Sequence, residues 1–270
     1  DGAVMSTATQ TLNLAIASPG NRLSRLLWMV SCSLLVSASH GRAHQPDPVI
    51  SPYVQRPPVI DGKLSEWPAS DFVTVTPQTG VFDAESDSTA DPGDLSFAFS
   101  VSNDDRYLYF AIRTTDDILV VDDNRDPSEK AGRPYMDDAI EIFIDGDHSH
   151  SPDGRDEEGI EYRTGGEFAV VANGAVSSSY SGFPRTNGDS LVWSSAGSYP
   201  PSPAAAYQAP WDTTGGEFGI EVRINLAVMG AGVGPGSRVG FTVSAHDDDD
   251  GGERDAALYW EGPGLRSRTG

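Results

Sequence analysis

Hydrophobic side chains recur at every second position in three segments of this 270-residue chain, Arg106–Arg113, Asp138–Asp145 and Glu217–Ile224. In the third segment, which alternates most regularly, the hydrophobic face comprises Phe218, Ile220, Val222 and Ile224. A period of two places successive side chains on opposite faces of an extended chain, whereas a helix requires a period near 3.6. The three segments are therefore predicted to be half-buried β-strands.

Turn-forming residues separate these segments from further candidate strands. The other candidates are Leu95–Val101, Glu167–Ala172, Arg238–His246 and Ala256–Trp260. The chain has 29 Gly and 19 Pro, and only Leu226–Met229 suggests a short helix. Many short strands joined by turns predict an all-β fold, an antiparallel β-sandwich of two packed sheets, immunoglobulin-like or jelly-roll-like. Residues 180–214, rich in Pro, Ser, Gly and aromatic residues, are predicted to form a long insert loop.

The first forty-odd residues differ in kind from the rest. Arg22 and Arg25 precede the apolar stretch Leu26–Ala38, and small residues follow as far as Ala43. This order is typical of a secretory signal peptide, with cleavage expected after Ala43; a buried core helix is the alternative. Because the sole cysteine, Cys32, lies in the apolar stretch, the mature chain is expected to have no disulfide and no thiolate metal ligand. We expect a secreted or periplasmic protein.

The charge balance excludes two classes of partner. The chain has 18 Lys and Arg against 40 Asp and Glu, a formal net charge of −22. Nucleic acids and anionic membranes are bound largely through basic residues, so neither is an expected partner. After Ala43 no stretch supplies the run of about 20 apolar residues that a membrane-spanning helix needs.

Several short motifs follow one another in a recognisable order. They are Val59–Trp67, Asp104–Ile112, Asp137–Asp145, Phe218–Leu226, Val239–Val243, and Asp248–Arg254 ahead of Leu258–Trp260. In order and spacing they resemble the carbohydrate-binding modules of family nine, over residues 50–262. The resemblance implies a calcium-containing β-sandwich that binds sugars without catalysis and is commonly attached to enzymes that degrade xylan or cellulose. Related sandwiches of the DOMON type bind haem instead.

The resemblance and the N-terminal pattern together divide the chain. We expect an N-terminal extension and signal peptide over 1–43, a connecting segment with the first strand over 44–58, the carbohydrate-binding sandwich over 59–262 and a tail over 263–270. The expected ligand is a plant or algal-type polysaccharide or oligosaccharide. Polysaccharide-degrading enzymes are the protein partners that the resemblance implies.

The resemblance also implies two sugar-binding residues, Tyr135 and Glu141. They match an aromatic residue that stacks on a sugar ring just before an Asp-x-Val-Glu-Ile-Phe strand, and the glutamate of that strand, which binds hydroxyls. An aromatic face offers apolar contact to the C–H groups of a pyranose, and a carboxylate accepts hydrogen bonds from hydroxyls. The alternatives are that Tyr135 packs a loop and that Glu141 is solvated.

Two side chains of the family's site are missing. Ala169 stands near the place of a basic residue, and no second stacking tryptophan follows Trp260. Aromatic residues of the insert could replace it, and the candidates are Trp193, Tyr199, Tyr207 and Trp211. Among these, Trp193 and Trp211 are the predicted ligand-binding residues, although aromatic residues in such loops more often anchor local packing.

Acidic residues are concentrated in three loop clusters, at 116–126, 145–157 and 247–250, and such clusters can bind a metal ion. The predicted calcium ligands are Asp116, Asp117, Asp122, Asp126, Asp145, Asp147, Asp153 and Asp248. Calcium takes six to eight oxygen ligands and tolerates flexible geometry. Each cluster alone could be a solvated acidic turn, but crowded carboxylates repel one another. The clusters together therefore predict at least one calcium site.

The sequence offers no catalytic motif. A nucleophile elbow, an HExxH zinc motif, a phosphate-binding loop and a dinucleotide fingerprint are all missing, so we do not expect an enzyme. A haem would need axial Met or His ligands; Met136 and His246 are the candidates, but a core position is favoured for Met136. The main alternative function is a structural or adhesive surface protein whose loops calcium stabilises.

Overall fold

The computed structural model describes residues 48–84, 90–146, 165–180, 193–198, 211–230 and 232–260, with the backbone alone described for 179–180, 198 and 211–217. The strands are β1 (Val73–Val75), β2 (Val81–Ala84), β3 (Leu95–Asn103), β4 (Tyr107–Val121), β5 (Ala139–Asp145), β6 (Gly166–Val171), β7 (Val176–Tyr180), β8 (Trp193–Ser198), β9 (Trp211–Asn225), β10 (Gly240–Asp247) and β11 (Ala256–Tyr259). Short 3₁₀ helices are η1 (Leu64–Glu66), η2 (Ala69–Asp71), η3 (Pro134–Met136) and η5 (Leu226–Met229).

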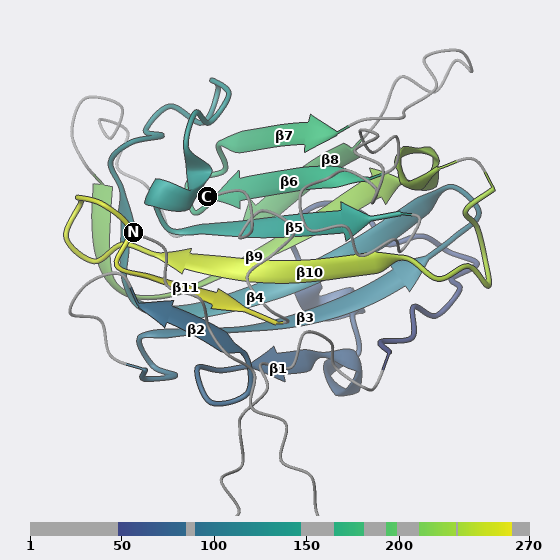
Figure 1. Cartoon of the computed structure of the whole chain (residues 1–270), viewed down its shortest axis with the longest axis horizontal. Helices are drawn as coiled ribbons and strands as arrows, with labels where there is room; N and C mark the ends of the chain where they lie inside the picture. Colours follow the sequence, from purple (N-terminus) through teal and green to yellow (C-terminus); the bar gives the residue numbers. More distant parts are fainter. Residues whose placement is uncertain are drawn as a thin grey trace, which may run out of the picture. The chain divides into compact units, whose positions relative to one another are not determined.

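The strands form two antiparallel sheets that pack face to face (Figure 1). One sheet has five strands in the order β1-β3-β4-β9-β8, and the other has six in the order β2-β11-β10-β5-β6-β7. Fully buried side chains such as Phe99, Phe110 and Ile140 fill the space between them. The predicted all-β sandwich is thus confirmed. In the part of the chain that the structure describes, no helix has the length and apolarity needed to cross a membrane.

The strands found from hydrophobic alternation are the interior strands of the two sheets. The alternation missed β1, β2, β7 and β8, and each of these lies at the edge of its sheet. Two of them span three and four residues, and the other two are rich in serine. Edge strands are commonly short or polar because they pair on one side and bury less surface. A regular hydrophobic pattern is therefore not required of them.

Two segments differ from the sequence-based expectation. The segment 180–214, predicted to be a loop, contains β8 and the first residues of β9 in its described part. The first strand was expected within 44–58, but β1 begins at Val73; the described residues of 44–58 contribute only an isolated bridge between Tyr53 and Asn103. Proline is frequent in that segment and lacks the N–H that a ladder needs.

Trp193 explains how a segment rich in Ser and Gly joins a sheet. Its ring meets the ring of Phe168 edge to face, with centroids 5.4 Å apart. Its Nε1 donates a hydrogen bond to Ser178 Oγ at 3.2 Å. Because Phe168 and Ser178 belong to the six-stranded sheet and Trp193 to the other, this side chain links the sheets at one edge of the sandwich.

Residues 54–72, which we call the N-terminal segment, cover the outer face of the five-stranded sheet. In β4 the side chains of Tyr107 and Tyr109 point away from the central core and pack with Trp67 in a second, smaller hydrophobic cluster. The segment adds further apolar side chains to this cluster, namely Val54, Ile60, Leu64 and Phe72. That face of the sandwich is consequently closed by the chain itself.

A buried carboxylate fastens this segment to the sheet. Glu221 of β9 has an exposed fraction of 0% although it faces away from the central core. Its Oε1 accepts a hydrogen bond from Trp67 Nε1 at 2.8 Å, and its Oε2 accepts from the backbone N–H groups of Asp61 and Gly62, both at 2.9 Å. Three donors to one carboxylate offset much of the cost of burying its charge. The Asp-Gly pair and the tryptophan of the Val59–Trp67 motif therefore act together at this contact.

The glycine of that pair is required by space and by backbone conformation. Gly62 has a φ of +79°, a region that side chains other than glycine's rarely adopt. A Cβ at this position would lie 2.5 Å from the carbonyl carbon of Gly197 in β8. The turn can approach the backbone of β8 this closely only because residue 62 is glycine.

Replacing Glu221 by Gln should destabilise the fold. The amide nitrogen would face one of the N–H donors and leave it unpaired, so we expect the free energy of unfolding to fall by about 2 kcal/mol. Urea unfolding followed by tryptophan fluorescence measures the change. The exposed Glu129 offers a matched control, and Glu129→Gln should unfold at the urea concentration of the wild type. Equal urea midpoints for the two variants would show that the hydrogen bonds of Glu221 do not hold the N-terminal segment on the sheet.

Candidate functional site

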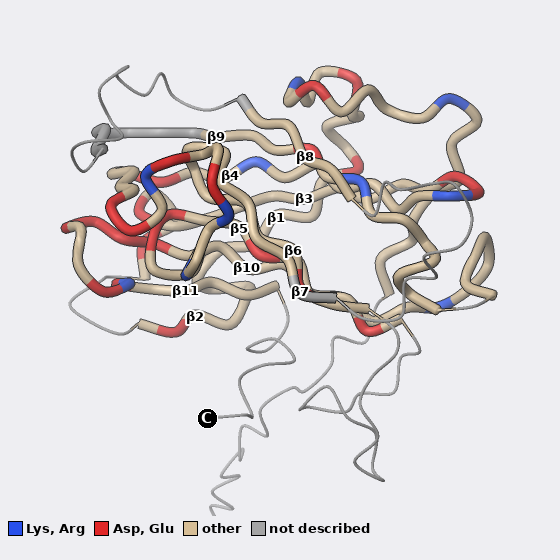
Figure 2. Tube along the Cα trace, turned by 90° about the horizontal axis from the view of Figure 1, so that it is seen from above, with Lys and Arg blue, Asp and Glu red and all other residues tan. Residues whose placement is uncertain are grey.

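Acidic residues from four separate parts of the chain converge at one end of the sandwich, where Figure 2 shows red segments gathered. We call this set the buried acidic cluster; its members are Asp94, Asp116, Asp117, Asp138, Asp247 and Asp249. They form overlapping groups of three in which carboxylate oxygens lie within 4.8 Å of one another. The members lie in or beside β3, β4, β5 and β10, so antiparallel pairing across both sheets assembles the cluster.

Three members are almost completely buried and poorly hydrogen-bonded. The exposed fractions of Asp116, Asp138 and Asp247 are 2%, 1% and 0%. Asp116 Oδ1 accepts from the N–H of Ile118 at 3.0 Å, and Asp138 Oδ2 accepts from the N–H of Val120. Asp116 Oδ2, Asp138 Oδ1 and both oxygens of Asp247 receive no donor from the described residues. Such groups are costly to bury as anions unless a proton or a cation joins them.

The pKa values of these carboxyl groups reflect that cost. Burial, followed by the charge of Asp249, raises the pKa of Asp116 to about 8. Burial and the charge of Asp116 raise the pKa of Asp247 to about 9 and that of Asp138 well above its usual range. Once deprotonated, these carboxylates form a set of acceptor-only oxygens with few donors around them, which matches the ligand preference of calcium. The residues present therefore fit the ion that the sequence predicts.

The structure assigns different places to the predicted calcium ligands. Asp116 and Asp117 belong to the buried acidic cluster, while Asp122 and Asp248 meet in a separate group with Asp137. The acidic runs near 116–126 and 247–250, which are far apart in the sequence, are thus brought together. Nothing in their sequence spacing indicates this, because it results from the arrangement of β4 and β10 in the sandwich.

Other predicted ligands are not part of these groups. Asp126 caps a turn, since its Oδ1 accepts from Ser128 N and Oγ at 2.8 and 2.6 Å, and these bonds lower its pKa. Asp145 ends β5, the strand whose other end adjoins Asp138. Neither Asp126 nor Asp145 joins a group of three among the described residues. The remaining two predicted ligands, Asp147 and Asp153, lie outside the described residues.

Seven members of the groups are not among the predicted ligands, and some of these directly precede strands. Asp94 directly precedes β3, and Asp137 and Asp138 directly precede β5. Their common signal is an acidic residue at the start of a hydrophobic strand. An acidic residue at that position is equally typical of the polar border of a strand. The pattern therefore does not identify Asp94, Asp137 or Asp138 as metal ligands.

Glu141, the predicted sugar ligand, lies on the outer face of the six-stranded sheet. It pairs with Ser244 of β10 on one side and with Ala169 of β6 on the other. Its exposed fraction is only 4%, so it is not the solvated side chain of the alternative interpretation. Ala169, which stands where a basic side chain was expected, is fully buried beside it.

A chain of polar contacts fixes one oxygen of Glu141. His246 Nε2 lies 3.1 Å from Glu141 Oε2 and 3.2 Å from Ser244 Oγ, while its Nδ1 lies 3.1 Å from Arg254 Nη1. A guanidinium only donates, so Nδ1 must accept and the ring proton must lie on Nε2, directed at Glu141. The other oxygen, Glu141 Oε1, is buried and receives no donor from any described residue. Glu141 therefore presents one fixed and one unsatisfied acceptor.

Met136 and His246, the two residues considered as haem ligands, are engaged in contacts within the protein. Both ring nitrogens of His246 have polar partners, Glu141 with Ser244 at one and Arg254 at the other. Met136 is buried in η3, which packs against β5, β6 and β10. These contacts support the favoured interpretation of Met136 as a core residue.

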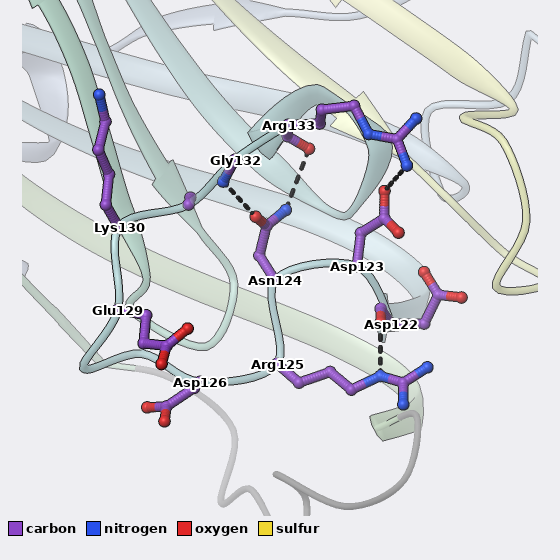
Figure 3. A pocket seen from close by; sticks show the side chains of 10 residues that line it. Asp122, Asp123, Asn124, Arg125, Asp126, Glu129, Lys130, Gly132 and Arg133 are labelled. Carbon is purple, nitrogen blue, oxygen red and sulfur yellow. Dashed lines mark hydrogen bonds and ion pairs between the residues drawn. The ribbon is translucent and has the colours of Figure 1, made fainter.

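Tyr135, the predicted stacking residue, lies in η3 between two buried neighbours and is itself half-buried. The loop that leads to it, residues 122–133, surrounds a cavity of about 500 Å³ (Figure 3). Arg133 pairs with Asp123 at 2.7 Å, and Asn124 Nδ2 donates to the carbonyl oxygen of Arg133 at 3.0 Å. The lining carries charged side chains of both signs and more polar than apolar surface, so it favours a hydrated, polar occupant.

The two tryptophans proposed for the insert have different outcomes. The indole of Trp193 is engaged with Phe168 and Ser178, as described above, which is the packing role of the alternative interpretation. Trp211 begins β9 and pairs with Val121, but its side chain lies outside the described residues.

The stability of the calcium-free protein should fall as the pH rises. Because Asp116 and Asp247 have raised pKa values when folded, the folded state binds more protons than the unfolded state between about pH 5 and pH 8. We expect the melting temperature of protein stripped of divalent ions to decrease across this range. Differential scanning fluorimetry in metal-free buffers measures it.

Two controls define this effect. Asp247→Asn should flatten the pH dependence, because it removes one of the shifted groups. Saturating calcium should reverse it, since the ion binds deprotonated carboxylates and is favoured at higher pH. A melting temperature of the stripped wild type that stays constant or rises with pH would contradict the raised pKa values.

The chain is similar to a known protein family and to several solved structures. Residues 60–267 match the model of a family described as carbohydrate family 9 binding domain-like. No curated protein matches the chain at a significant level. Among solved structures, a carbohydrate binding module family 9 from Caldicellulosiruptor kristjanssonii in complex with cellotriose is 20% identical, with a TM-score of 0.49 over 78% of this chain and 84% of that one. A structure from the same organism in complex with glucose is also 20% identical, with a TM-score of 0.49 over 79% and 91% of the two chains.

The family assignment rests on the sequence match, which spans most of the chain. It confirms the resemblance drawn from the ordered motifs, and the family consists of binding domains without catalytic activity, as expected. This protein belongs to the carbohydrate family 9 binding domain-like family.

Proposed function

We propose that this chain binds plant or algal-type polysaccharides or oligosaccharides, without catalysis, on the outer face of the six-stranded sheet around Glu141. The observation that carries the proposal is the state of the Glu141 carboxylate: one oxygen is fixed by His246 and the other is buried without a described donor. A sugar hydroxyl is a donor of the right chemistry to satisfy it. Family membership supports the same class of ligand.

Residues near Glu141 in the fold support the proposed binding site. His246 and Arg254 hold the carboxylate in one orientation, which reduces the entropy lost when a ligand binds. Tyr135 lies in η3, which packs against the strand that carries Glu141, and its ring can supply apolar contact to a pyranose. The proposed site thus combines one stacking surface with one oriented acceptor.

Calcium has a structural part in this proposal. Asp116, Asp138 and Asp247 would hold the ion, with Asp94 and Asp249 beside them. When bound, the ion supplies positive charge that neutralises carboxylates left without donors. The chain's own contribution is to bring these carboxylates together from both sheets and to exclude water from them.

Glu141→Gln should weaken carbohydrate binding at least tenfold. Loss of a hydrogen bond to a charged acceptor costs about 1.5–3 kcal/mol, and about 1.4 kcal/mol corresponds to a factor of ten in Kd. Tyr135→Ala should weaken binding as well, whereas Tyr135→Phe should retain it. Isothermal titration calorimetry with cellotriose, glucose and a panel of plant and algal polysaccharides, with and without chelator, measures the affinities.

Asp83→Asn is the matched control for this experiment. Asp83 lies in β2 of the same sheet, and its partner Ala257 is also paired with His246, so it shares the outer face but lies farther from Glu141. It is exposed, and the variant should bind like the wild type. Binding that is unaffected by both Glu141→Gln and Tyr135→Ala would place the ligand elsewhere on the molecule.

A second candidate function is a calcium-stabilised structural or adhesive surface protein. The buried acidic cluster favours it, because a divalent ion there would rigidify loops whatever the molecule binds. No sugar binding across the panel, together with a lower melting temperature in chelator, would select this function. A Soret absorption band on the purified protein would select the haem-binding alternative of the DOMON type.

We also propose that the protein is exported, by cleavage of a signal peptide after Ala43. The support is the order of Arg22, Arg25, the apolar stretch 26–38 and the small residues that follow. N-terminal sequencing of the protein recovered outside the cytoplasm should begin at His44. Replacing Leu34 and Leu35 by Arg should retain the protein inside the cell; export of that variant would contradict the proposal.

A further inference from the structure

A buried serine, Ser244 of β10, lies directly opposite Glu141 on the six-stranded sheet. Its chain neighbours Val243 and Ala245 belong to the central core, so Ser244 points to the outer face, as Glu141 does. Side chains directly opposite each other in an antiparallel pair have Cβ atoms about 4.5–5.5 Å apart. The exposed fraction of Ser244 is 0%. A buried hydroxyl group therefore lies beside the buried carboxylate of the proposed sugar site.

The contacts of His246 determine the direction of the Ser244 hydroxyl group. Ser244 Oγ lies 3.2 Å from His246 Nε2. That nitrogen carries the ring proton, because Nδ1 lies 3.1 Å from Arg254 Nη1, which can only donate. Ser244 Oγ is therefore an acceptor towards His246. Its own proton has no acceptor in the described part of the chain.

His246 itself is held in place from several sides. Its cross-strand neighbours are Ala139 and Ala257, whose small side chains leave room for the imidazole. The ring of Tyr259 packs edge to face against the imidazole, with centroids 6.2 Å apart and an interplanar angle of 87°. Burial raises the pKa of the Tyr259 phenol, and the charge of Arg254, with a hydrogen bond from it, opposes that rise. Arg254 thus contacts both rings and fixes the orientation of the imidazole.

A donor without an acceptor consequently lies beside an acceptor without a donor. Glu141 Oε1 is buried and receives no hydrogen bond from the described residues, and the Ser244 proton has no acceptor among them. A hydroxyl group both donates and accepts, whereas a carboxylate or an ether oxygen only accepts and an ammonium group only donates. Of these groups, a hydroxyl alone satisfies both buried atoms.

We infer that Ser244 is a specificity-determining residue of the proposed sugar site, because its Oγ donates to the same ligand hydroxyl that donates to Glu141 Oε1. His246 and Arg254 act as positioning residues for this pair. The inference rests on the carbohydrate binding proposed above and adds the requirement for one unsubstituted hydroxyl. A ligand that lacks this hydroxyl leaves buried polar groups unpaired and should be rejected.

Ser244→Ala should weaken the binding of glucose and cellotriose about three- to tenfold, the value of one neutral hydrogen bond. Isothermal titration calorimetry measures the change. Ser100→Ala is the matched control, since Ser100 is also buried, with an exposed fraction of 3%, but lies in β3 of the other sheet; it should bind like the wild type. Wild-type affinity in Ser244→Ala would overturn this inference alone, whereas a wild type that binds no carbohydrate would refute the proposed function as well.

Monodeoxy glucoses identify the hydroxyl that the pair binds. In the wild type, removal of that hydroxyl should weaken binding at least tenfold, because both buried groups lose their partner. In Ser244→Ala and in Glu141→Gln, removal of the same hydroxyl should cost less, since one partner is already missing. Loss of coupling to two different hydroxyls in the two variants would overturn the inference.

The wild type alone supplies a further comparison should Ser244→Ala fail to fold. The O-methyl ether of glucose at that position accepts but cannot donate, so it should bind as poorly as the deoxy sugar. A methyl ether that binds as tightly as glucose would contradict the paired contact.

Nitrogen-15 NMR of the imidazole tests the orientation of Ser244 without any ligand. At pH 8, above the ordinary titration range of histidine, His246 should show its N–H at Nε2 and an unprotonated Nδ1. The chain has five histidines, so the signals are assigned as those missing from His246→Phe. Arg254→Met should shift the Nδ1 signal towards that of a free nitrogen, and Arg254→Lys, which retains a donor, should shift it less. A wild-type ring protonated at Nδ1 would make Ser244 the donor to His246 and would overturn the inference.

Discussion

The hydrogen bonds that Glu221 accepts from the N-terminal segment determine which face of the sandwich can bind a ligand. They hold the Asp61-Gly62 turn and Trp67 against β9, and Trp67 then packs with Tyr107 of β4. The outer face of the five-stranded sheet is thereby covered by the chain's own hydrophobic side chains. The six-stranded sheet keeps polar groups on its outer face, and the proposed site lies there.

Three buried carboxylates show how the number of donors separates structural from functional roles. Glu221 receives three hydrogen bonds from described N–H groups and serves as a clamp. Glu141 is fixed at one oxygen by His246 and has none from the described residues at the other. Asp247 receives none at either oxygen from the described part of the chain. An unsatisfied buried anion is unstable. The contacts of Glu221 are complete, whereas a neutral donor would complete those of Glu141 and a cation would complete those of Asp247.

Much of this fold is predictable from sequence, and the limits have physical causes. Interior strands such as β5 alternate in hydrophobicity because the core requires it, whereas edge strands are short or polar and carry no such requirement. Glu221 and Glu141 both alternate with core residues and look alike as outward-facing positions. Their different roles depend on what covers each sheet, and local spacing does not contain that information.

The acidic residues proposed to bind calcium show the same limit more sharply. Asp138 and Asp145 flank one strand, and the sequence places both in acidic surroundings. At about 3.3 Å per residue, the length of that strand separates them by roughly 20 Å, so they cannot share an ion. Asp247 and Asp248 are adjacent in the chain yet face different groups. Which acidic residues meet depends on the direction of each strand and on which face of the sheet each side chain occupies. Both are known only once the strands are paired.

The arrangement of β5 and β10 links the acidic end to the proposed sugar site. These neighbouring strands pair Glu141 with Ser244 and Ala139 with His246, so the contact between Glu141 and His246 spans the ladder. The same ladder ends beside the acidic residues that precede β5 and terminate β10. A calcium ion held between the two strand ends would bind the folded state alone and stabilise it by about 2.7 kcal/mol at a hundredfold excess over its Kd. That stabilisation would act on the two strands that orient the Glu141 carboxylate, so loss of the ion should loosen the sugar site before it unfolds the face that Glu221 closes.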